Sequence, residues 1–307
     1  MNHMYANRRE KLRQAMRARG LDALLVSQAA NRFYLSGFEL HDPQYNESAG
    51  RLVITADGSW INGKVFPLKE IVDKAVRFSP TVENVIVVKR TGSEVTMDPL
   101  RDHWYHDLQA LPIAKGKCET EKLDSEHPLY ILYTSGSTGK PKAILHTHGG
   151  YMVGTYTTLK YSFDMRPEDR WWCTADPGWV TGTSYGIIAP LVLGATSIVD
   201  EADFDPLRWI HILESERVNV WYTAPTAIRL LMKAGPELFA GHRFPDLRFI
   251  ASVGEALNPE AVCWGLEAFG RPIHDNWWQS ETGGIMIANT AAQDIKPGSM
   301  GRPLPGV

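Results

Sequence analysis

Between Trp171 and Trp277, short apolar runs alternate with longer stretches whose apolar residues recur at helical spacing. The runs suit buried strands and the stretches suit helices, which predicts an α/β fold, a layered domain with a largely parallel sheet flanked by helices. Ligands of such folds bind at the carboxyl ends of the strands. Residues 179–193 are apolar almost all round, so that helix is expected to be buried. The predicted strands are 171–174, 218–222, 247–253 and 273–277. Three more helices are predicted. The first carries the apolar stripe Leu207, Ile210 and Leu213, the second starts at Pro225, and the third starts at Pro259 with Asn258 as its cap.

Composition limits the class of protein. The chain has 307 residues, a net charge of −3, 44% hydrophobic residues and 22% charged residues. This balance is typical of a globular protein and indicates neither a nucleic-acid nor a membrane partner. Three widely separated cysteines, Cys118, Cys173 and Cys263, favour reduced thiols and a cytoplasmic location. The sequence contains no run long enough to cross a membrane and no signal-peptide core at its N-terminus.

A stretch of small residues lies between two further apolar runs. Residues 130–133 and 143–145 suit the two strands of a hairpin, and residues 134–139 between them are all glycine or hydroxyl-bearing. Such a tip can present backbone N–H groups and hydroxyls to an anion, with Lys140 and Lys142 supplying charge. It is not a Walker A loop, because too few residues separate its glycines and Pro141 follows the lysine.

The segment YTSGSTGKPK in this hairpin resembles the phosphate-binding loop of the adenylate-forming superfamily, which includes acyl-CoA synthetases, luciferases and nonribosomal peptide adenylation domains. The resemblance implies that the loop binds the phosphates of ATP and that Lys142 is catalytic. The implied nucleotide-binding residues of the loop are Thr134, Ser135, Gly136, Ser137, Thr138 and Gly139.

Three more clusters follow predicted strands, ADPGWVTG (175–182), SVGEALNPE (252–260) and DNWWQSETGG (275–284), and each resembles a segment of the acetyl-CoA synthetases. The resemblance implies that Val180, Thr181, Val253 and Trp278 line the acyl pocket and that Thr181 also contacts coenzyme A. The implied nucleotide-binding residues in these clusters are Gly254, Glu255, Ala256, Asp275, Asn276, Trp277, Trp278, Gln279 and Ser280. Adjacent strand residues point to opposite faces, so one of the two tryptophans can pack inward while the other fills a site.

The resemblance also implies the reaction. Acetate attacks the α-phosphorus of ATP to give acetyl-adenylate and pyrophosphate, and coenzyme A then displaces AMP, as in an acid–thiol ligase. Glu281 would hold Mg²⁺ on the triphosphate and Thr282 would bond to phosphate oxygens, so both are expected to be catalytic. The Trp278 indole would fill the space that a longer acyl chain needs, which favours acetate or at most propionate. The implied partners are small molecules, acetate, ATP and coenzyme A.

Residues 1–59 read as a small α/β segment, with a helix from Asn7 to Gly20 and strands at 24–26, 32–35 and 51–55. This segment resembles the N-terminal domain of the creatinase and aminopeptidase P family. The predicted domains are therefore 1–59 and an AMP-binding synthetase core at 60–307. His41 and Asp42 are the only pair there that suggests a metal, and a metallopeptidase is the alternative function for this segment.

The synthetase-like part begins with a helix opened by Pro67 and a strand at 85–88. Residues 298–307 resemble the family segment just before the distal subdomain, so residues 60–307 are expected to be a partial core without that subdomain or the C-terminal domain. We therefore expect weak nucleotide binding without formation of acetyl-CoA, or a non-catalytic nucleotide-binding fragment.

Overall fold

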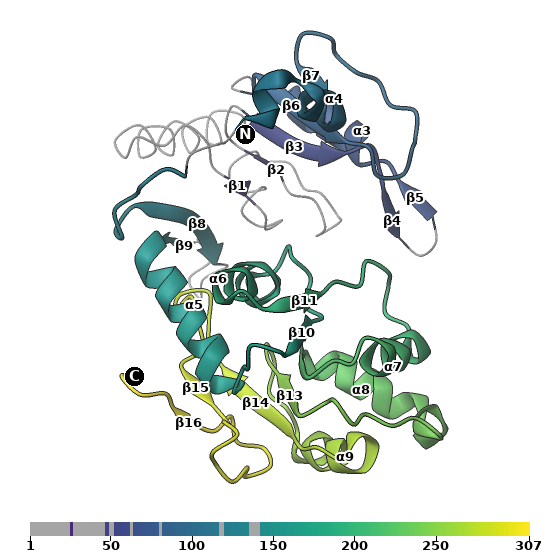
Figure 1. Cartoon of the computed structure of the whole chain (residues 1–307), viewed down its shortest axis with the longest axis vertical. Coiled ribbons are helices and arrows are strands. Elements are labelled where there is room, and N and C mark those ends of the chain that lie inside the picture. The colour runs from purple at the N-terminus through teal and green to yellow at the C-terminus, as the bar shows by residue number, and fades with distance from the viewer. Residues whose placement is uncertain are drawn as a thin grey trace. The chain divides into compact units, whose positions relative to one another are not determined.

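The computed structural model describes residues 25–26, 47–48, 52–61, 64–79, 82–116, 120–134 and 142–307. The chain divides into two compact units, Met1–His148 and Gly149–Val307, and Figure 1 labels most of their helices and strands. The predicted helix from Asn7 and the predicted strand at 32–35 lie outside the described residues. Each unit has sheets of its own.

The first unit is built around the parallel sheet β3-β6-β7, formed by Leu52–Ala56, Asn84–Val88 and Asp102–Trp104. Helix α3 (Leu68–Val76) starts directly after Pro67, as predicted, and buries Val72 against the sheet. Strand β3 lies upstream of residue 60 and pairs with β6 downstream, so the two sides of the predicted domain boundary share one sheet. The other elements are β1 (Leu25–Val26), β2 (Glu47–Ser48), β4 (Ser59–Ile61), β5 (Lys64–Phe66), α4 (Tyr105–Ala110), the 3₁₀ helix η1 (Pro112–Lys115), β8 (Pro128–Thr134) and β9 (Lys142–Thr147).

The carboxylate of Asp57, at the end of β3, organises the loop that follows β6. One oxygen accepts hydrogen bonds from the N–H groups of Gly58, Arg90 and Thr91, and the other accepts from Gly92 and Ser93, over distances of 2.7 to 3.0 Å. Burial alone would raise the pKa of Asp57, but these N–H groups outweigh it and lower the pKa below its ordinary value. The charged carboxylate therefore stabilises this loop at neutral pH.

Asp57→Asn is expected to lower the free energy of unfolding by about 2 kcal/mol. The amide keeps one acceptor oxygen, but its NH₂ group would face N–H groups of the loop that now donate to the second carboxylate oxygen. Urea unfolding at neutral pH measures the loss. Asp98→Asn is a suitable control, because Asp98 accepts a hydrogen bond only from the exposed N–H of Leu100 among the described side-chain contacts. Equal losses in the two variants would contradict this role of Asp57.

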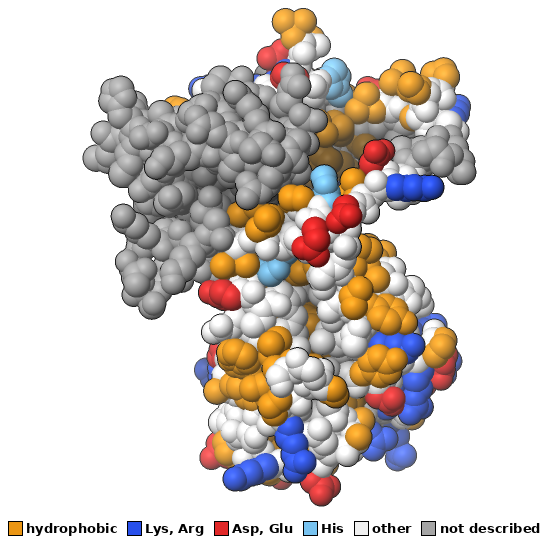
Figure 2. Space-filling model, turned by 90° about the vertical axis from the view of Figure 1, so that its left-hand side faces the viewer, with side chains coloured by type: hydrophobic (Ala, Val, Ile, Leu, Met, Phe, Trp, Pro, Cys, Tyr) orange, Lys and Arg blue, Asp and Glu red, His pale blue; other side chains and the backbone are white. Residues whose placement is uncertain are grey.

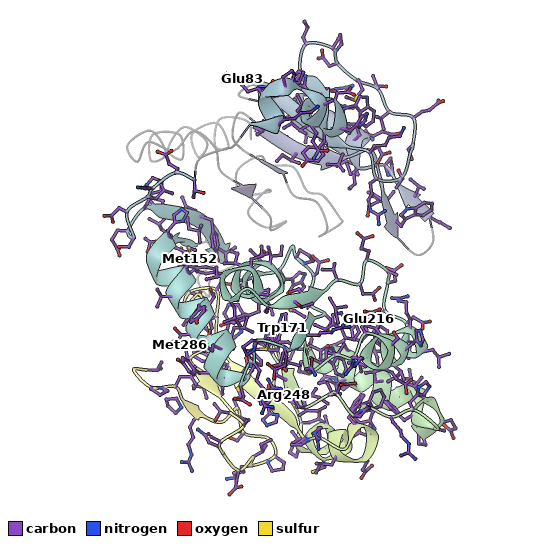
Figure 3. All side chains as sticks on the ribbon, in the orientation of Figure 1. Glu83, Met152, Trp171, Glu216, Arg248 and Met286 are labelled. Carbon is purple, nitrogen blue, oxygen red and sulfur yellow. The ribbon has the colours of Figure 1, made fainter. Side chains whose placement is uncertain are left out.

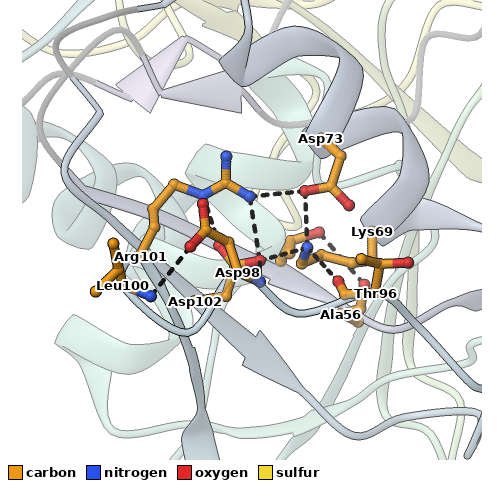
Figure 4. Close-up of polar contacts among 9 residues, drawn as sticks. Ala56, Lys69, Asp73, Thr96, Asp98, Leu100, Arg101 and Asp102 are labelled. Carbon is orange, nitrogen blue, oxygen red and sulfur yellow. Dashed lines mark hydrogen bonds and ion pairs between the residues drawn. The ribbon is translucent and has the colours of Figure 1, made fainter.

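A buried lysine lies at the centre of an ion cluster in the same unit (Figure 4). The Lys69 Nζ atom is 2.7 Å from both Asp73 and Asp102 and donates to the carbonyl of Thr96. Arg101 pairs with the same two carboxylates at 2.9 and 2.6 Å. Burial would raise the pKa of Asp102, but hydrogen bonds from Arg101 and Lys69 outweigh it and lower the pKa to about 2. All four side chains are paired, so the cluster joins α3 to the start of β7 without an uncompensated buried charge.

The second unit contains a seven-stranded sheet in the order β11-β10-β12-β13-β14-β15-β16. The first five strands pair in parallel and the last two antiparallel, which confirms the predicted α/β fold with a largely parallel sheet. The strands are Thr196–Ile198, Arg170–Cys173, Val220–Thr223, Phe249–Ser252, Ile273–Trp277, Ile287–Ala288 and Arg302–Pro303 in that spatial order, and the helices are α5 (His148–Ser162), the π-helix η2 (Gly182–Ile188), α6 (Ala189–Leu193), α7 (Pro206–Ser215), α8 (Pro225–Ala234), the 3₁₀ helix η3 (Pro236–Phe239) and α9 (Pro259–Phe269).

Helices cover both faces of this sheet, and the side chains between the layers form two cores (Figure 3). Successive strand residues point to opposite faces, so Trp171 lies in one core and Trp172 in the other. The core on the Trp172 side contains residues of α7, α8 and α9, and the core on the Trp171 side contains residues of α5, η2 and α6. Strands β12 and β13 are buried along their whole length, as expected of central parallel strands.

Two predictions for the second unit are wrong. The predicted helix at 179–193 is present as η2 followed directly by α6, but it is not buried all round, because Trp179 just before it is 65% exposed and Leu191 is 75% exposed. The change from π-helix to α-helix lies next to Pro190, which has no N–H to donate. Hydrophobic side chains also lie among charged ones on the face of this unit seen in Figure 2.

The second wrong prediction concerns Asn258, which precedes α9 but does not cap it with its side chain. Its Nδ2 atom points to Glu260 at 3.4 Å, and its Oδ1 atom is buried without a hydrogen-bond partner.

Among the described residues, no helix has the length and apolar character needed to span a bilayer.

Candidate functional site

The carboxyl ends of β10, β12, β13 and β14 meet at one edge of the second unit's sheet, because these strands are parallel neighbours. The three clusters predicted from the sequence follow β10, β13 and β14 directly. Val180, Thr181, Val253 and the segment from Asp275 to Thr282 are thus supplied by three chain segments to the same edge. This is where ligands bind in such folds.

Three of the four predicted acyl-pocket residues, Val180, Val253 and Trp278, come together in the core on the Trp171 side. Trp278, directly after β14, is 8% exposed and lies in the same cluster as Val253, and Val180 packs against that cluster. Thr181 is half-buried at the start of η2. The ring of Tyr185 contacts Trp278 edge-on, with centroids 5.2 Å apart. Trp277 is half-buried at the end of β14, so only Trp278 is packed into the core.

The loop after β13 holds the residues predicted to contact adenine. Gly254 has φ of +99° and is exposed, and a Cβ at this position would meet no atom within 4 Å. The Glu255 carboxylate accepts a 2.5 Å hydrogen bond from the Thr226 hydroxyl and pairs with Arg229, and these contacts lower its pKa. Ala256 is exposed. The backbone is therefore open to a flat ligand, while Glu255 is held against α8.

Asp275 and Asn276 are buried within β14, although both were predicted to bind nucleotide. Burial raises the pKa of Asp275 to about 6, despite hydrogen bonds from the N–H groups of Leu257 and Asn276. Asn289 binds the Asp275 carbonyl through its N–H and its side chain. A carboxyl group with a raised pKa at the ligand-binding edge of a sheet is typical of functional sites.

The turn after Trp278 contains both predicted catalytic residues of this unit. The Thr282 hydroxyl accepts a hydrogen bond from the Gln279 N–H and lies 3.0 and 2.9 Å from the carbonyls of Gln279 and Gly284. Its single proton is therefore directed at the turn itself, and a bond to phosphate requires the hydroxyl to rotate. Glu281 and Gln279 are exposed, and Ser280 is half-buried.

The predicted hairpin of the first unit is confirmed, since β8 and β9 pair antiparallel from Pro128↔Thr147 to Thr134↔Lys142. Ser135, Gly136, Ser137, Thr138 and Gly139 lie outside the described residues, and of Thr134 and Lys142 only the strand pairing is described. The strands therefore bring the two ends of the predicted phosphate loop together.

In the N-terminal segment the sequence offers only the pair His41 and Asp42 as a suggestion of a metal. His41 and Asp42 lie outside the described residues. In the part of the chain that the structure does describe, no three histidine, cysteine, aspartate or glutamate side chains form a metal-binding group. Cys173 and Cys263 are free thiols, and burial raises the pKa of Cys173 to about 12.

Sequence reasoning missed the polar partners of Trp278. Its Nε1–H donates to the Tyr222 hydroxyl at 3.2 Å, and that hydroxyl donates to Asn276 Oδ1 at 3.0 Å. In the sequence Tyr222 looked like one more residue of an apolar strand. A fully buried tyrosine needs a partner for its hydroxyl, so a tyrosine in a predicted central strand was the available signal.

Comparisons with known proteins agree with this architecture. A family profile described as "AMP-binding enzyme" matches residues 42–307. The chain is 46% identical over 288 residues to an acetyl-coenzyme A synthetase of Chlorobaculum tepidum and 48% identical over 286 residues to one of Methanothrix thermoacetophila. Each match covers 91% of this chain and 43% of the relative, so the chain spans less than half the length of these relatives.

A solved structure gives the same result for the fold. The crystal structure of an acyl-CoA synthetase of Brucella canis matches with a TM-score of 0.69 at 26% identity, over 84% of this chain and 44% of that protein. The family profile starts upstream of residue 60, and none of these matches supports the resemblance of residues 1–59 to the creatinase family. Because the profile covers most of the sequence, the chain belongs to the AMP-binding enzyme family.

Proposed function

We propose that this chain is part of an AMP-forming acetate–CoA ligase, an acid–thiol ligase that uses ATP, Mg²⁺ and coenzyme A. The observation that carries the proposal is the packing of Trp278 with Val253 and Val180 at the carboxyl edge of the sheet. The proteins named acetyl-coenzyme A synthetase, which share almost half of its residues over the matched region, support the choice of acetate.

The acyl pocket would be short because Trp278 is fixed and bulky. Its ring is held by Tyr185 on one side and by the hydrogen bond to Tyr222 on another. An acyl chain longer than that of acetate or propionate would have to displace an indole that is packed in the core. Val180 and Val253 would form the other walls, and Thr181 would contact coenzyme A.

The adenine ring would lie against Gly254, Glu255 and Ala256. The open backbone at Gly254 fits a flat ring, because any side chain there would occupy the approach. The segment from Asp275 to Ser280 would bind the rest of the nucleotide. In this arrangement the raised pKa of Asp275 lets its carboxyl group be neutral at mildly acid pH beside an anionic ligand.

In the second unit, Thr282 would bond to phosphate oxygens and Glu281 would hold Mg²⁺. In the first unit, the 134–139 loop and Lys142 keep the phosphate-binding role that the resemblance implies for them. The Glu281 side chain is exposed, and no hydrogen bond or ion pair ties it to another described residue, which fits a role as a Mg²⁺ ligand. Bound Mg²⁺ would neutralise part of the triphosphate charge that repels acetate. The protein supplies alignment and charge and needs no nucleophile of its own.

We also propose a cytoplasmic location and a division of the chain into two domains, with the boundary upstream of its predicted position between residues 59 and 60. The synthetase-like region would extend upstream of residue 60, because β3 shares a sheet with β6 and the family profile starts at residue 42.

Ala256→Trp is expected to weaken AMP binding by about tenfold or more, because an indole there fills the space proposed for adenine. Ala256 is exposed, so the melting temperature should change little. Ala234→Trp, at the exposed end of α8, is the matched control and should bind AMP like the unaltered chain. Calorimetric titration measures both, and equal affinities for the two variants would contradict the adenine site.

The reaction itself is tested by ATP–pyrophosphate exchange with the 307-residue chain. The sequence predicts nucleotide binding without turnover for this chain. Exchange that depends on acetate would contradict that prediction and directly support the ligase chemistry.

A further inference from the structure

Two hydrogen bonds in series connect Trp278 to strands on both sides of β13. Trp278 follows β14 and donates from Nε1 to the hydroxyl of Tyr222 on β12, and Tyr222 donates to Asn276 Oδ1 on β14. All three side chains are buried. The direction of the series is fixed, because an indole N–H can only donate and the tyrosine hydroxyl has one proton.

Tyr222 itself cannot move to follow Trp278. Its ring lies between Phe163, Trp171 and Tyr185, with centroid distances of 4.9, 5.6 and 5.7 Å. Burial raises its pKa well above the ordinary value, so the hydroxyl keeps the proton that it donates to Asn276. The lone pair offered to Trp278 therefore stays in one place.

We propose that Tyr222 is a positioning residue that fixes the orientation of the Trp278 indole and thereby sets the chain-length limit of the acyl pocket, with Asn276 orienting the Tyr222 hydroxyl. This inference rests on the proposed function, in which Trp278 closes that pocket. A ring held by packing alone can turn about its side-chain bonds, whereas a ring also held by its N–H has one favoured orientation.

Loss of the hydroxyl should release the indole in a particular direction. In Tyr222→Phe the Trp278 N–H has no acceptor within the aromatic core, and a buried donor without a partner is strongly unfavourable. Rotation that brings the N–H to water or to a ligand removes this penalty. The same rotation vacates space beside Val253 for a longer chain.

Tyr185 provides a matched control in the same cluster. Its ring contacts Trp278, but its hydroxyl bonds to Thr158 and accepts from the Ile285 N–H. Tyr185→Phe therefore also removes one buried tyrosine hydroxyl and leaves buried polar groups without a partner, yet it leaves the Trp278 N–H bonded. A purely structural effect of losing a hydroxyl should be the same in both variants.

The test uses AMP and its ethyl and butyl phosphate esters, whose alkyl groups stand for a short and a long acyl chain. Calorimetric titration of the full chain gives the ratio of butyl-ester to ethyl-ester affinity. Tyr222→Phe is expected to raise this ratio by about tenfold while AMP itself binds as before, and Tyr185→Phe is expected to leave the ratio unchanged.

The outcomes separate the two proposals. An unchanged ratio in Tyr222→Phe, with AMP binding intact, overturns the positioning role and leaves the proposed function standing. Equal rises in both tyrosine variants also overturn it, because they indicate general loosening. Absence of AMP binding by the unaltered chain overturns the proposed function and this inference together. A shift of the Trp278 indole N–H resonance in Tyr222→Phe but not in Tyr185→Phe would support the positioning role independently of ligand.

Discussion

Gly182→Ala is expected to lower the free energy of unfolding by about 3–4 kcal/mol, a large effect for the addition of one methyl group. A Cβ at this position would lie 2.0 Å from the Asp176 carbonyl oxygen and 2.7 Å from that of Ala175. Both obstacles are backbone atoms, so no side chain can rotate away to relieve the overlap.

The turn that would have to move is bonded to itself and to the π-helix. Within the turn, the Trp179 N–H donates to the Asp176 carbonyl. Thr183 of the π-helix donates its N–H to the Trp179 carbonyl and its hydroxyl to the Pro177 carbonyl. Relief of the overlap breaks some of these bonds and displaces Val180 and Thr181, which lie between the turn and the helix. We therefore expect a loss of ligand affinity as well as of stability.

Gly186→Ala, one turn further along the same π-helix, is the matched control. Its Cβ would meet the Cys173 side chain at 3.8 Å, an ordinary contact. Alanine also has the higher helix propensity, so this variant should be as stable as the unaltered chain to within about 1 kcal/mol. Urea unfolding of both variants decides the matter, and similar stabilities would show that the turn yields easily.

Much of the second unit could be predicted because its signals are local. Strand β12 is buried on both faces and begins with the apolar run Val220–Tyr222. Helices α7, α8 and α9 each start at a proline that suits the first helical position. The parallel order then follows from the alternation of strands and helices. Placement of the three segments that carry Val180, Val253 and Trp278 at one edge follows from that order, whereas the choice of these residues came from the resemblance to the acetyl-CoA synthetases.

What could not be predicted depends on contacts between residues far apart in the sequence. Nothing in the local pattern shows that Asp57 accepts N–H groups from residues 90–93, or that Trp278 donates to Tyr222. The Asn258 cap was predicted from a residue preference, but its amide turns to Glu260 instead. Residues 179–193 are apolar almost all round, and hydropathy alone cannot locate the change from π-helix to α-helix near Pro190.

Two neighbours on β14 carry opposite pKa shifts. His274 lies stacked on Phe249 and near the Ile250 carbonyl, and burial lowers its pKa from 6.5 to about 4 against the opposing effect of backbone carbonyls. Burial raises the pKa of Asp275 from 3.8 to about 6. Both residues therefore favour their uncharged forms in the folded protein.

The shifts have opposite effects on stability. Between about pH 6.5 and 4 the unfolded chain binds the His274 proton more tightly than the folded chain, so this residue lowers stability as the pH falls. Over about the same range the folded chain holds the Asp275 proton more tightly, so this residue raises stability as the pH falls. Each effect amounts to about 3 kcal/mol, and in the unaltered chain they nearly cancel.

Removing either side chain should reveal the effect of the other on the pH dependence of stability. Relative to the unaltered chain, Asp275→Asn is expected to lose about 3 kcal/mol of stability when the pH is lowered from about 7 to about 4, because only His274 still titrates there. His274→Gln is expected to gain a similar amount over the same range, because only Asp275 still titrates. Urea unfolding at several pH values measures how the stability of each variant changes with pH, and the contributions of all other groups cancel in the difference from the unaltered chain.

The stability of the double variant should change with pH in parallel with that of the unaltered chain, because neither residue then titrates and the two effects nearly cancel in the unaltered chain. Single-variant curves that run parallel to that of the unaltered chain would show that these two side chains titrate normally, and that burial in β14 does not hold them uncharged.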